Sequence, residues 1–350
     1  MSPPRSLRLG LGLAALAIAA VVPLLPFFGK NLVAASVAAV AVLYAFGILS
    51  VVVLTGYVGQ VSLCQATFMG ISAFTTAAVV NQVPSIPYLG AAVIGVLVSF
   101  LFGVLVGLPA LRLRGILLAI VTVGIALVFD YYFSIDGAFK WFNGGLSGWS
   151  ITGTTLLGLD LNDLDFDHIM HIYWLLLVVF GVIAVLVVNL HDSGSGRRFR
   201  AIRESEIAAA TMGVDLTRYK LLAFGLSAAV AGIGGAFFPL VEGRVTNEPF
   251  SFFHSLQFAA IAVLVGIRFV PAAFLGGIFI SVFPELLNHA QDVIHRQIRG
   301  EWFNVALGIL LIVQMISLPE GVWGQEAKRF EHIFQRLGRQ KAPPLKVPAS

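Results

Sequence analysis

Long runs of apolar residues, separated by short polar, proline or glycine interruptions, dominate the sequence. Most of these runs have close to the roughly 20 residues that an α-helix needs to cross a bilayer. They cover approximately residues 9–28, 31–54, 61–80, 88–108, 116–133, 169–190, 218–241, 253–267, 272–288 and 304–318. The pattern predicts an all-α polytopic membrane protein with about ten transmembrane helices.

Two of the ten runs are less regular than the others. Residues 61–80 carry polar side chains, among them Ser62, Gln65 and Thr67, and we expect a broken or partly re-entrant helix there. Such backbone occurs at membrane depth where protein or a water-filled cavity covers it. Residues 253–267 form a short run that need not cross the whole bilayer.

The first run, 9–28, follows Arg5 and Arg8 and therefore resembles a secretory signal. However, it is longer than a signal core, and Pro23 and Pro26 interrupt it where a small-residue cleavage site would stand. We interpret it as a retained first helix.

Composition supports a membrane location. Hydrophobic residues make up 58% of the 350 residues and charged residues 11%. A soluble domain of this length has too little interior to hide so much apolar surface, so a bilayer must solvate the surplus. Cys64 is the single cysteine, which excludes a disulfide within the chain.

Basic residues set the expected orientation, because cytoplasmic loops carry an excess of Lys and Arg. With the N-terminus inside and ten alternating spans, 17 of the 22 Lys and Arg residues fall on the cytoplasmic side. Both termini are therefore expected to be cytoplasmic. The acidic loop 134–168 falls outside.

We expect a transmembrane domain over residues 1–320, with a cytoplasmic loop at 191–220, and a basic tail over 321–350. Phe330, Ile333, Phe334 and Leu337 recur at helical spacing among basic residues in that tail, which is typical of a helix lying on an anionic membrane surface. The same basic residues could instead serve orientation alone.

Several kinds of chemistry have little support in the sequence. Gly29–Lys30 lacks the glycine spacing of a phosphate-binding loop, so any ATPase must be another polypeptide. Asp130 and Glu285 are the carboxylates nearest membrane depth, fewer than an ion-coupled carrier usually has. His168 and His171 have metal-pair spacing without a third ligand nearby. We expect a non-catalytic chain without a metal or cofactor of its own.

The cytoplasmic segment 196–220 reads GRRFRAIRESEIAAATMGVDLTRYK. Its composition favours one short helix from about Arg198 to Met212. Gly213 would end this helix and Asp215 would cap the next one. An apolar side formed by Ile202, Ile207 and Ala210 could fill a groove on a partner, and Glu204 and Glu206 could meet basic residues there. A plain basic loop that satisfies topology is the alternative.

Within this segment, EIAAATMGVD resembles the loop of ABC importer permeases in which Glu-Ala-Ala precedes a glycine. The continuation TRYKLLAFGLSAAVAGIGGAFF is similar to the branched-chain amino acid ABC transporter permease family, the LivH/LivM type. Three further blocks resemble that family in the same order: GYVGQVSLCQATFMGISAF (56–74), LRLRGILLAIVTVGIALV (111–128), which is closer to LivM, and FNGGLSGWSI (142–151). The similarity spans roughly residues 40–320.

The resemblance implies an ABC importer permease fold and a set of site residues. The motif of the helix that couples to the ATPase would comprise Glu204, Glu206, Ile207, Ala208, Ala209 and Gly213. Polar residues within apolar helices are candidates for the substrate path or for interhelical hydrogen bonds: Gln60, Ser62, Gln65 and Thr67. The external loop would use Asn143, Gly144, Gly145, Ser147 and Gly148 for docking or gating.

The implied partners are two cassette ATPase subunits carrying ATP and Mg, a second homologous permease, an extracytoplasmic binding protein and the lipid bilayer, with no nucleic acid. The sequence departs from the family at Cys64–Gln65, where Gly-His is more usual, and at Gly266–Pro271, which lacks a Gly-Gly-x-Gly pattern. These departures leave the substrate open between branched-chain amino acids and other small solutes such as urea or amides. An ion-coupled secondary carrier and a membrane enzyme are the rival classes.

Overall fold

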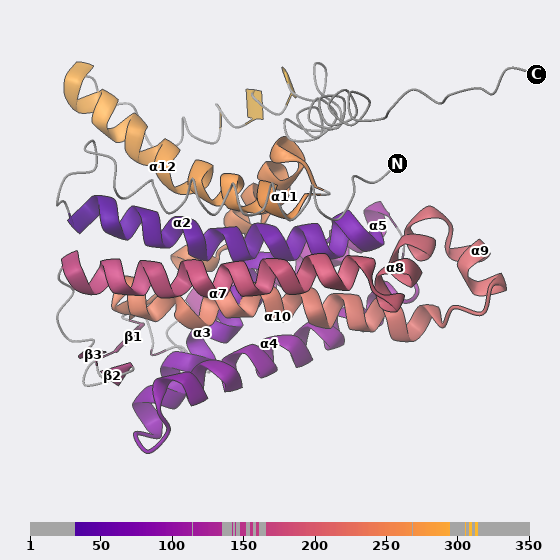
Figure 1. The fold of residues 1–350 in the computed structure, drawn as a ribbon, viewed down its shortest axis with the longest axis horizontal. Helices are drawn as coiled ribbons and strands as arrows, with labels where there is room; N and C mark the ends of the chain where they lie inside the picture. Colours follow the sequence, from indigo (N-terminus) through magenta and orange to yellow (C-terminus); the bar gives the residue numbers. More distant parts are fainter. Residues whose placement is uncertain are drawn as a thin grey trace, which may run out of the picture.

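The computed structural model describes residues 32–134 and 166–294, except positions 114 and 268, and separate short stretches between 142 and 160 and between 305 and 313. The expected first span at 9–28, most of the expected last span at 304–318 and the tail at 321–350 lie outside the described residues. Between these limits the chain forms a bundle of helices that run along its long axis (Figure 1).

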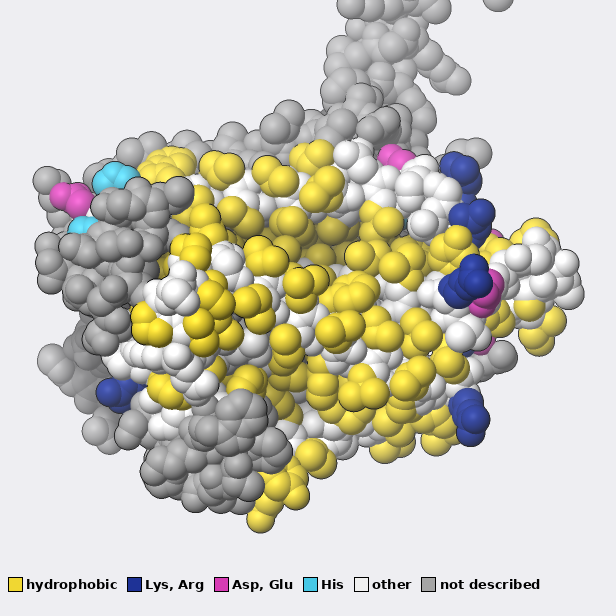
Figure 2. All heavy atoms as spheres, turned by 90° about the horizontal axis from the view of Figure 1, so that it is seen from below, with side chains coloured by type: hydrophobic (Ala, Val, Ile, Leu, Met, Phe, Trp, Pro, Cys, Tyr) yellow, Lys and Arg dark blue, Asp and Glu magenta, His cyan; other side chains and the backbone are white. Residues whose placement is uncertain are grey.

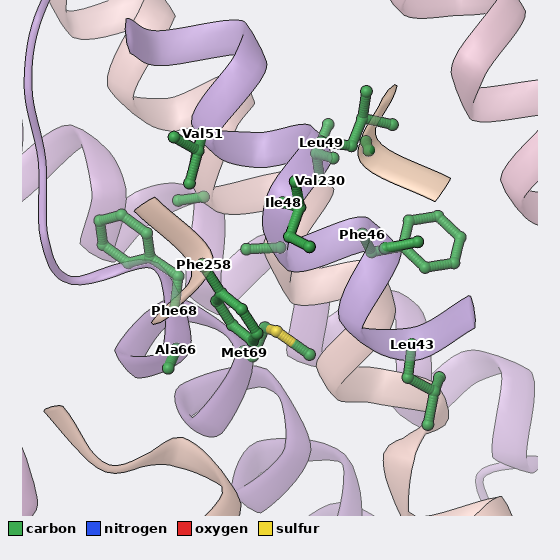
Figure 3. Close-up of a cluster of buried hydrophobic side chains, with 14 of the residues drawn as sticks. Leu43, Phe46, Ile48, Leu49, Val51, Ala66, Phe68, Met69, Val230 and Phe258 are labelled. Atoms are coloured by element: carbon green, nitrogen blue, oxygen red, sulfur yellow. The ribbon is translucent and has the colours of Figure 1, made fainter. Parts of the chain in front are cut away.

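One of the enclosed helices of the bundle is α2 (Leu32–Val51), which continues as a π-helical segment, η2 (Val52–Val58). It packs against α12, α10 and α7. Its side chains are apolar on all sides, which is the pattern of a helix surrounded by other helices. Fully buried Leu43, Phe46 and Leu49 project from it into the hydrophobic cluster shown in Figure 3.

The chain is non-helical between η2 and α3, so the first four residues of the run 61–80 are irregular, whereas the rest of that run forms one uninterrupted helix. Gly59 ends η2 in the left-handed conformation, with φ 79°. Residues 59–64 are not helical, and α3 (Gln65–Gln82) begins after them. Gln60, Ser62 and Cys64 of this stretch are buried among other helices, whereas Gly59 and Val61 are exposed. Irregular backbone survives at membrane depth where protein covers it in this way.

Helices α4 (Tyr88–Ala110) and α10 (Leu216–Glu242) lie antiparallel along their whole length. Small residues allow this: a Cβ added at Gly103 would collide with the Ala228 side chain. Ser99 Oγ accompanies the contact with hydrogen bonds to the carbonyl oxygens of Phe68 and Ala228, both at 2.9 Å. The small residues Ala228, Gly232 and Gly235 of α10 therefore serve close helix packing.

The remaining long helices cover this centre. They are α5 (Ile116–Ser134), α7 (Phe166–Asp192), α11 (Phe252–Val265) and α12 (Val270–Ile294). Helix α11 has 14 residues and a length of about 21 Å at 1.5 Å per residue, less than the hydrocarbon thickness of a bilayer. This length agrees with the expectation that residues 253–267 need not cross the whole bilayer.

Short strands connect the loops at one end of the bundle. β1 (Trp149–Ser150) pairs antiparallel with β4 (Arg244–Val245), and β2 (Thr155–Leu156) pairs with β3 (Leu159–Asp160). The β1–β4 pair joins the loop before α7 to the connection that follows α10. A 3-10 turn, η3 (Glu248–Phe250), then leads into α11.

The outer surface has the composition of a membrane-spanning bundle. Four helices of the described chain are long and apolar enough to cross a bilayer, and they cover Ala35–Val58, Tyr88–Ala110, Asp167–Asp192 and Leu216–Glu242. Leu97, Leu101 and Leu105 repeat along the outer face of α4 and are more than half exposed. Such a stripe matches lipid rather than water, and Figure 2 shows the apolar side chains as a broad band.

Basic side chains gather at one end of this band (Figure 2). Among the described Lys and Arg residues, Arg244 alone lies at the end that carries the short strands. The others lie at the opposite end, beside α8 and α9: Arg112, Arg197, Arg198, Arg200, Arg203, Arg218 and Lys220. The described helices alternate in direction as predicted, which brings these residues together.

Candidate functional site

A pair of short helices occupies the basic end of the bundle, between α7 and α10. Helix α8 (Gly194–Glu204) starts at Ser193, whose Oγ accepts a hydrogen bond from the Gly196 amide at 3.2 Å. Its apolar side faces the bundle: Phe199 and Ile202 are buried, and the Phe199 ring meets the Tyr219 ring edge-on at 6.0 Å. Helix α8 is therefore a fixed base and not a free loop.

The single helix predicted over Arg198–Met212 is wrong, because Ser205 divides it. Ser205 is extended (φ −161°, ψ 115°), and it ends α8 and caps α9 (Glu206–Thr211). Its Oγ accepts from the Ala208 amide at 3.2 Å, so the serine starts a new helix instead of continuing the old one. The break also turns Ile202 toward its own chain, so the prediction that Ile202 faces a partner together with Ile207 is wrong.

Helix α9 projects beyond the end of the bundle (Figure 1). Its Ile207 is 71% exposed and the following Met212 is 69% exposed, and Ala208 and Ala210 are exposed as well. Ala209 is fully buried on the opposite side of the helix. Two large apolar side chains in water at the tip of a projection are typical of a docking surface for another protein.

The ends of α9 agree with the predicted signals. Gly213 follows the helix with φ 80°, and the amide of Val214 donates to the Ala209 carbonyl oxygen at 3.0 Å. Asp215 caps α10, since its carboxylate accepts from the Arg218 amide at 3.1 Å. The chain thus turns sharply from α9 into α10, and the position of α9 is fixed at both ends.

An ion pair fastens α9 to the first turns of α10. Lys220 Nζ lies 2.8 Å from Glu206 Oε1; the Lys220 side chain is 2% exposed and the Glu206 side chain 17%. A charge at this depth requires a partner, because uncompensated burial is costly. The predicted coupling residue Glu206 therefore engages its own chain, whereas Glu204 is exposed. No sequence pattern indicates this partner, because Lys220 is one of several basic residues in the segment 196–220.

A second contact connects α8 to η2, directly before the non-helical residues 59–64. The Arg203 guanidinium donates through Nη1 to the Gly56 carbonyl oxygen, inside η2. A π-helical turn leaves such carbonyl groups available, and an arginine is suited to satisfy one. The aliphatic part of Arg203 also covers Gly59, where an added Cβ would lie 2.8 Å from Arg203 Cγ. Glycine is required at position 59 by its positive φ and by this contact.

The non-helical residues 59–64 and the first turn of α3, together called the broken segment, place all four candidate path residues inside the bundle. Gln65 accepts at Oε1 from Ser50 Oγ at 2.9 Å and from Ser227 Oγ at 3.3 Å, which joins α2, α3 and α10. Ser62 Oγ lies 3.2 Å from Cys64 Sγ. These contacts favour the interhelical interpretation for Gln65 in the conformation described.

Some polar side-chain atoms in this region nevertheless form no hydrogen bond with the described residues. Within the described residues, Gln60 Oε1, Gln65 Nε2 and Thr67 Oγ1 are buried and have no hydrogen-bond partner. Nearby backbone amides donate hydrogen bonds to side chains of other helices. The Leu63 amide donates to Thr122 Oγ1 of α5 and the Ala66 amide to Ser255 Oγ of α11, both at 3.0 Å. Buried polar groups are usually hydrogen-bonded in native proteins, so these side chains retain hydrogen-bonding capacity that the described conformation does not use.

The glycine-rich segment 142–151 is described in part. Asn143, Gly145 and Ser147 lie outside the described residues, whereas Gly144 and Gly148 have φ of 73° and 66°. A Cβ at Gly148 would collide with the Val245 carbonyl oxygen of β4. Gly148 therefore serves the β1–β4 pairing, which fixes this loop to the connection between α10 and α11.

His168 and His171, the pair with metal-ligand spacing, lie in the first turns of α7. His171 Nδ1 lies 2.6 Å from the Asp167 carbonyl oxygen, one helical turn away. In the part of the chain that the structure describes, no three His, Cys, Asp or Glu residues are grouped so as to hold a metal ion.

The fold defines a polytopic helical membrane protein, with a projecting helix pair at one end and a broken helix behind it. Comparison with known proteins gives the family: the chain matches the branched-chain amino acid transport system permease component over residues 33–315, and it belongs to this family. The LivM permease proteins of high-affinity branched-chain amino acid transport systems in Salmonella typhimurium and Escherichia coli K12 are 32% identical over 289 residues.

Those matches cover 77% of this chain and 65% of the LivM proteins, so the chain spans just under two thirds of the length of these relatives. The LivH permease protein of Salmonella typhimurium is 29% identical over 149 residues, 43% of this chain and 46% of LivH. The resemblance to the LivH/LivM type, closer to LivM, is thereby confirmed. No solved structure was found to match the chain.

Proposed function

We propose that this chain is the membrane-spanning permease subunit of an ABC importer in a bacterial plasma membrane, with branched-chain or related small amino acids as its cargo. The single observation that carries the proposal is the projecting α9, with Ile207 and Met212 in solvent and its position fixed through Glu206. The family membership and the printed names of the LivM and LivH relatives support the cargo.

The proposal assigns α9 to the cytoplasmic side, where it docks on a cassette ATPase. The basic residues beside it support this orientation, because cytoplasmic ends of spans carry an excess of Lys and Arg. Exposed Ile207 and Met212 fit a groove on the ATPase, and the rigid attachment through α8 passes movement of the groove to the bundle. Glu204 stays available for a basic residue of the partner.

Two contacts carry the movement further in this mechanism. Lys220 and Glu206 join α9 to α10, and Arg203 joins α8 to η2. A shift of the helix pair therefore acts on α10 and on the broken segment together. Nucleotide binding drives the change if the cassettes bind one arrangement more tightly than the other, since equal affinity shifts nothing.

Other subunits supply the energy and deliver the substrate in this proposal. The chain is non-catalytic; ATP and Mg are held by two cassette subunits, and a second homologous permease completes the membrane unit. An extracytoplasmic binding protein delivers the amino acid at the end that carries Gly144 and Gly148. The four candidate path residues, Gln60, Ser62, Gln65 and Thr67, become accessible to the solute when the broken segment moves.

Co-purification and reconstituted uptake test this function. The tagged chain is solubilised from its native membrane in mild detergent, its companions are identified, and the complex is placed in vesicles with leucine, isoleucine and valine. We expect a cassette ATPase to accompany the chain and uptake to require ATP. A chain that purifies alone and moves solute under an ion gradient without ATP is a secondary carrier, and that outcome overturns the proposal.

A further inference from the structure

A pocket of about 520 Å³ lies at the end of the bundle opposite α9, between α2, α10, α11 and α12. This volume is within the roughly 300–1,000 Å³ of small-molecule sites in proteins. None of the sequence motifs singles it out, because its lining comes from four separated segments. The fold alone brings them together, and the site is distinct from the broken segment described above.

The lining combines two kinds of residue. Val37, Val40, Ile280 and Pro284, from α2 and α12, are apolar. Glu242 of α10, His254 and Gln257 of α11 and Ser281 of α12 are polar or charged. Such a division suits a small ligand with one aliphatic end and one polar end, and it is poorly suited to a wholly polar solute or to a lipid chain.

The charge around the pocket is negative. Glu242, the last residue of α10, is exposed at the edge of the pocket, and Glu248 is near enough to interact electrostatically with Tyr44 and His254. Asp130 also acts on His254. Among the described Lys and Arg residues, Arg244 is the one at this end of the bundle, and it does not line the pocket. The polar end of a ligand is therefore expected to carry a positive charge.

The pocket also contains an unused hydrogen-bonding group. Ser281 Oγ is shielded from solvent and has no hydrogen-bond partner among the described residues. Buried hydroxyl groups are nearly always hydrogen-bonded in native proteins, so an unpaired one in a pocket wall indicates a missing partner. The His254 ring, which lies 5.8 Å from the Tyr44 ring, also lines the pocket and supplies a second donor.

We propose that this pocket binds a small α-amino acid with an aliphatic side chain. The ammonium group pairs with Glu242, the carboxylate accepts hydrogen bonds from Ser281 and His254, and the side chain packs on Val37, Val40 and Ile280. This inference rests on the proposed function, because it takes the cargo to be an amino acid. It adds a site within the permease itself, at the end where solute enters, and so assigns part of the specificity to this chain.

Direct binding tests the site without the extracytoplasmic binding protein. The permease–ATPase complex in lipid nanodiscs is titrated with radiolabelled leucine, and 3-methylbutylamine and 4-methylpentanoate are added as competitors. Because the ammonium group pairs with a carboxylate, the amine should compete and the acid should not. Glu242→Gln should weaken leucine binding roughly tenfold, the range of a charge-assisted hydrogen bond, and should reduce the preference for the amine.

Glu285→Gln is the matched control. Glu285 is an exposed carboxylate on α12 next to a pocket residue and is not part of the lining, so its substitution should leave leucine binding unchanged. Thiol labelling gives a second readout, since the native Cys64 is fully buried. A cysteine placed by Gln257→Cys should be protected from a small thiol reagent by leucine, whereas one placed by Glu285→Cys should not.

The outcomes separate the site from the function. Wild-type complex that imports leucine with ATP while Glu242→Gln binds and imports normally overturns the pocket and leaves the proposed function standing. Wild-type complex that binds leucine with the expected competitor preference but never imports an amino acid overturns the proposed function and supports the site. Absence of leucine binding by the wild-type complex overturns the pocket.

Discussion

Lys220 Nζ lies 2.8 Å from Glu206 Oε1, and this ion pair joins a helix that projects from the protein to a helix that runs through its centre. The lysine is almost completely enclosed, so its charge depends on that single carboxylate among the partners described. Glu206 is also the first residue of α9, where a negative charge is favourable beside the helix N-terminus. The pair therefore stabilises the attachment of α9 and its helical state at once.

Breaking this ion pair should lower the stability of the folded protein. Lys220→Met removes the ammonium that pairs with Glu206, and Glu206→Gln removes the carboxylate that neutralises the buried Lys220, so each should lower the thermal unfolding temperature of the purified protein. Removal of one member of a buried pair costs about 3–5 kcal/mol, and partial exposure of Glu206 places the expected value below that range. The double variant should recover part of the loss, with a coupling energy of about 1–3 kcal/mol.

The pair of Asp215 and Arg218 is the control for this measurement. Their charged atoms are 3.1 Å apart, at a similar distance, but their side chains are 48% and 86% exposed. Surface ion pairs contribute little, so Arg218→Met should leave the unfolding temperature nearly unchanged. Equal effects of Lys220→Met and Arg218→Met would contradict the structural role of the buried pair.

Much of this arrangement could be predicted from the sequence, and the reasons for the remainder are physical. Apolar runs fix membrane helices because each must satisfy its own backbone and match lipid, so eight of the ten predicted runs coincide with described helices α2–α5, α7 and α10–α12. Gly213 and Asp215 were recognised because their effects are local to the chain.

The errors arise where distant segments or competing local bonds decide. The helix predicted over Arg198–Met212 treats Ser205 as an interior residue, whereas the Ser205 side chain caps a new helix, α9. The contacts of Arg203 with Gly56 and of Glu206 with Lys220 depend on packing between segments that the sequence pattern treats separately. A serine followed by Glu in the middle of an expected helix was the one local signal that could have revealed the break.

The exposed face of α9 should matter for docking and not for folding. Ile207→Asp places a charge where the ATPase groove is expected to receive an apolar side chain. Because Ile207 is 71% exposed, the unfolding temperature should stay the same while the ATPase is lost on co-purification and transport falls at least tenfold. Thr217→Asp, an exposed position on the first turn of α10, is the control and should keep the ATPase bound.

Contact between Arg203 and Gly59 should link ATPase movement to the broken helix. Gly59→Ala adds a Cβ that meets Arg203 Cγ at 2.8 Å and places alanine at φ 79°. We expect the ATPase to remain bound while leucine uptake per ATP hydrolysed decreases. Gly115→Ala shares the positive φ, 58°, but meets no atom within 4 Å, so it isolates the effect of backbone strain. Equal losses in both variants would show that strain alone is responsible.

Movement of the broken segment during transport can be followed through its own cysteine. Cys64 is the single cysteine of the chain and is fully buried beside Ser62 in the conformation described, so a small thiol reagent should leave the resting complex unlabelled. If residues 59–64 open toward the solute path, labelling should appear when ATP and leucine are supplied together and stop when hydrolysis is blocked. Cys64→Ser gives the background, and Gly59→Ala should slow the labelling in proportion to uptake. A thiol that stays unlabelled throughout turnover would assign Gln60, Ser62 and Gln65 to helix packing and place the solute path elsewhere in the bundle.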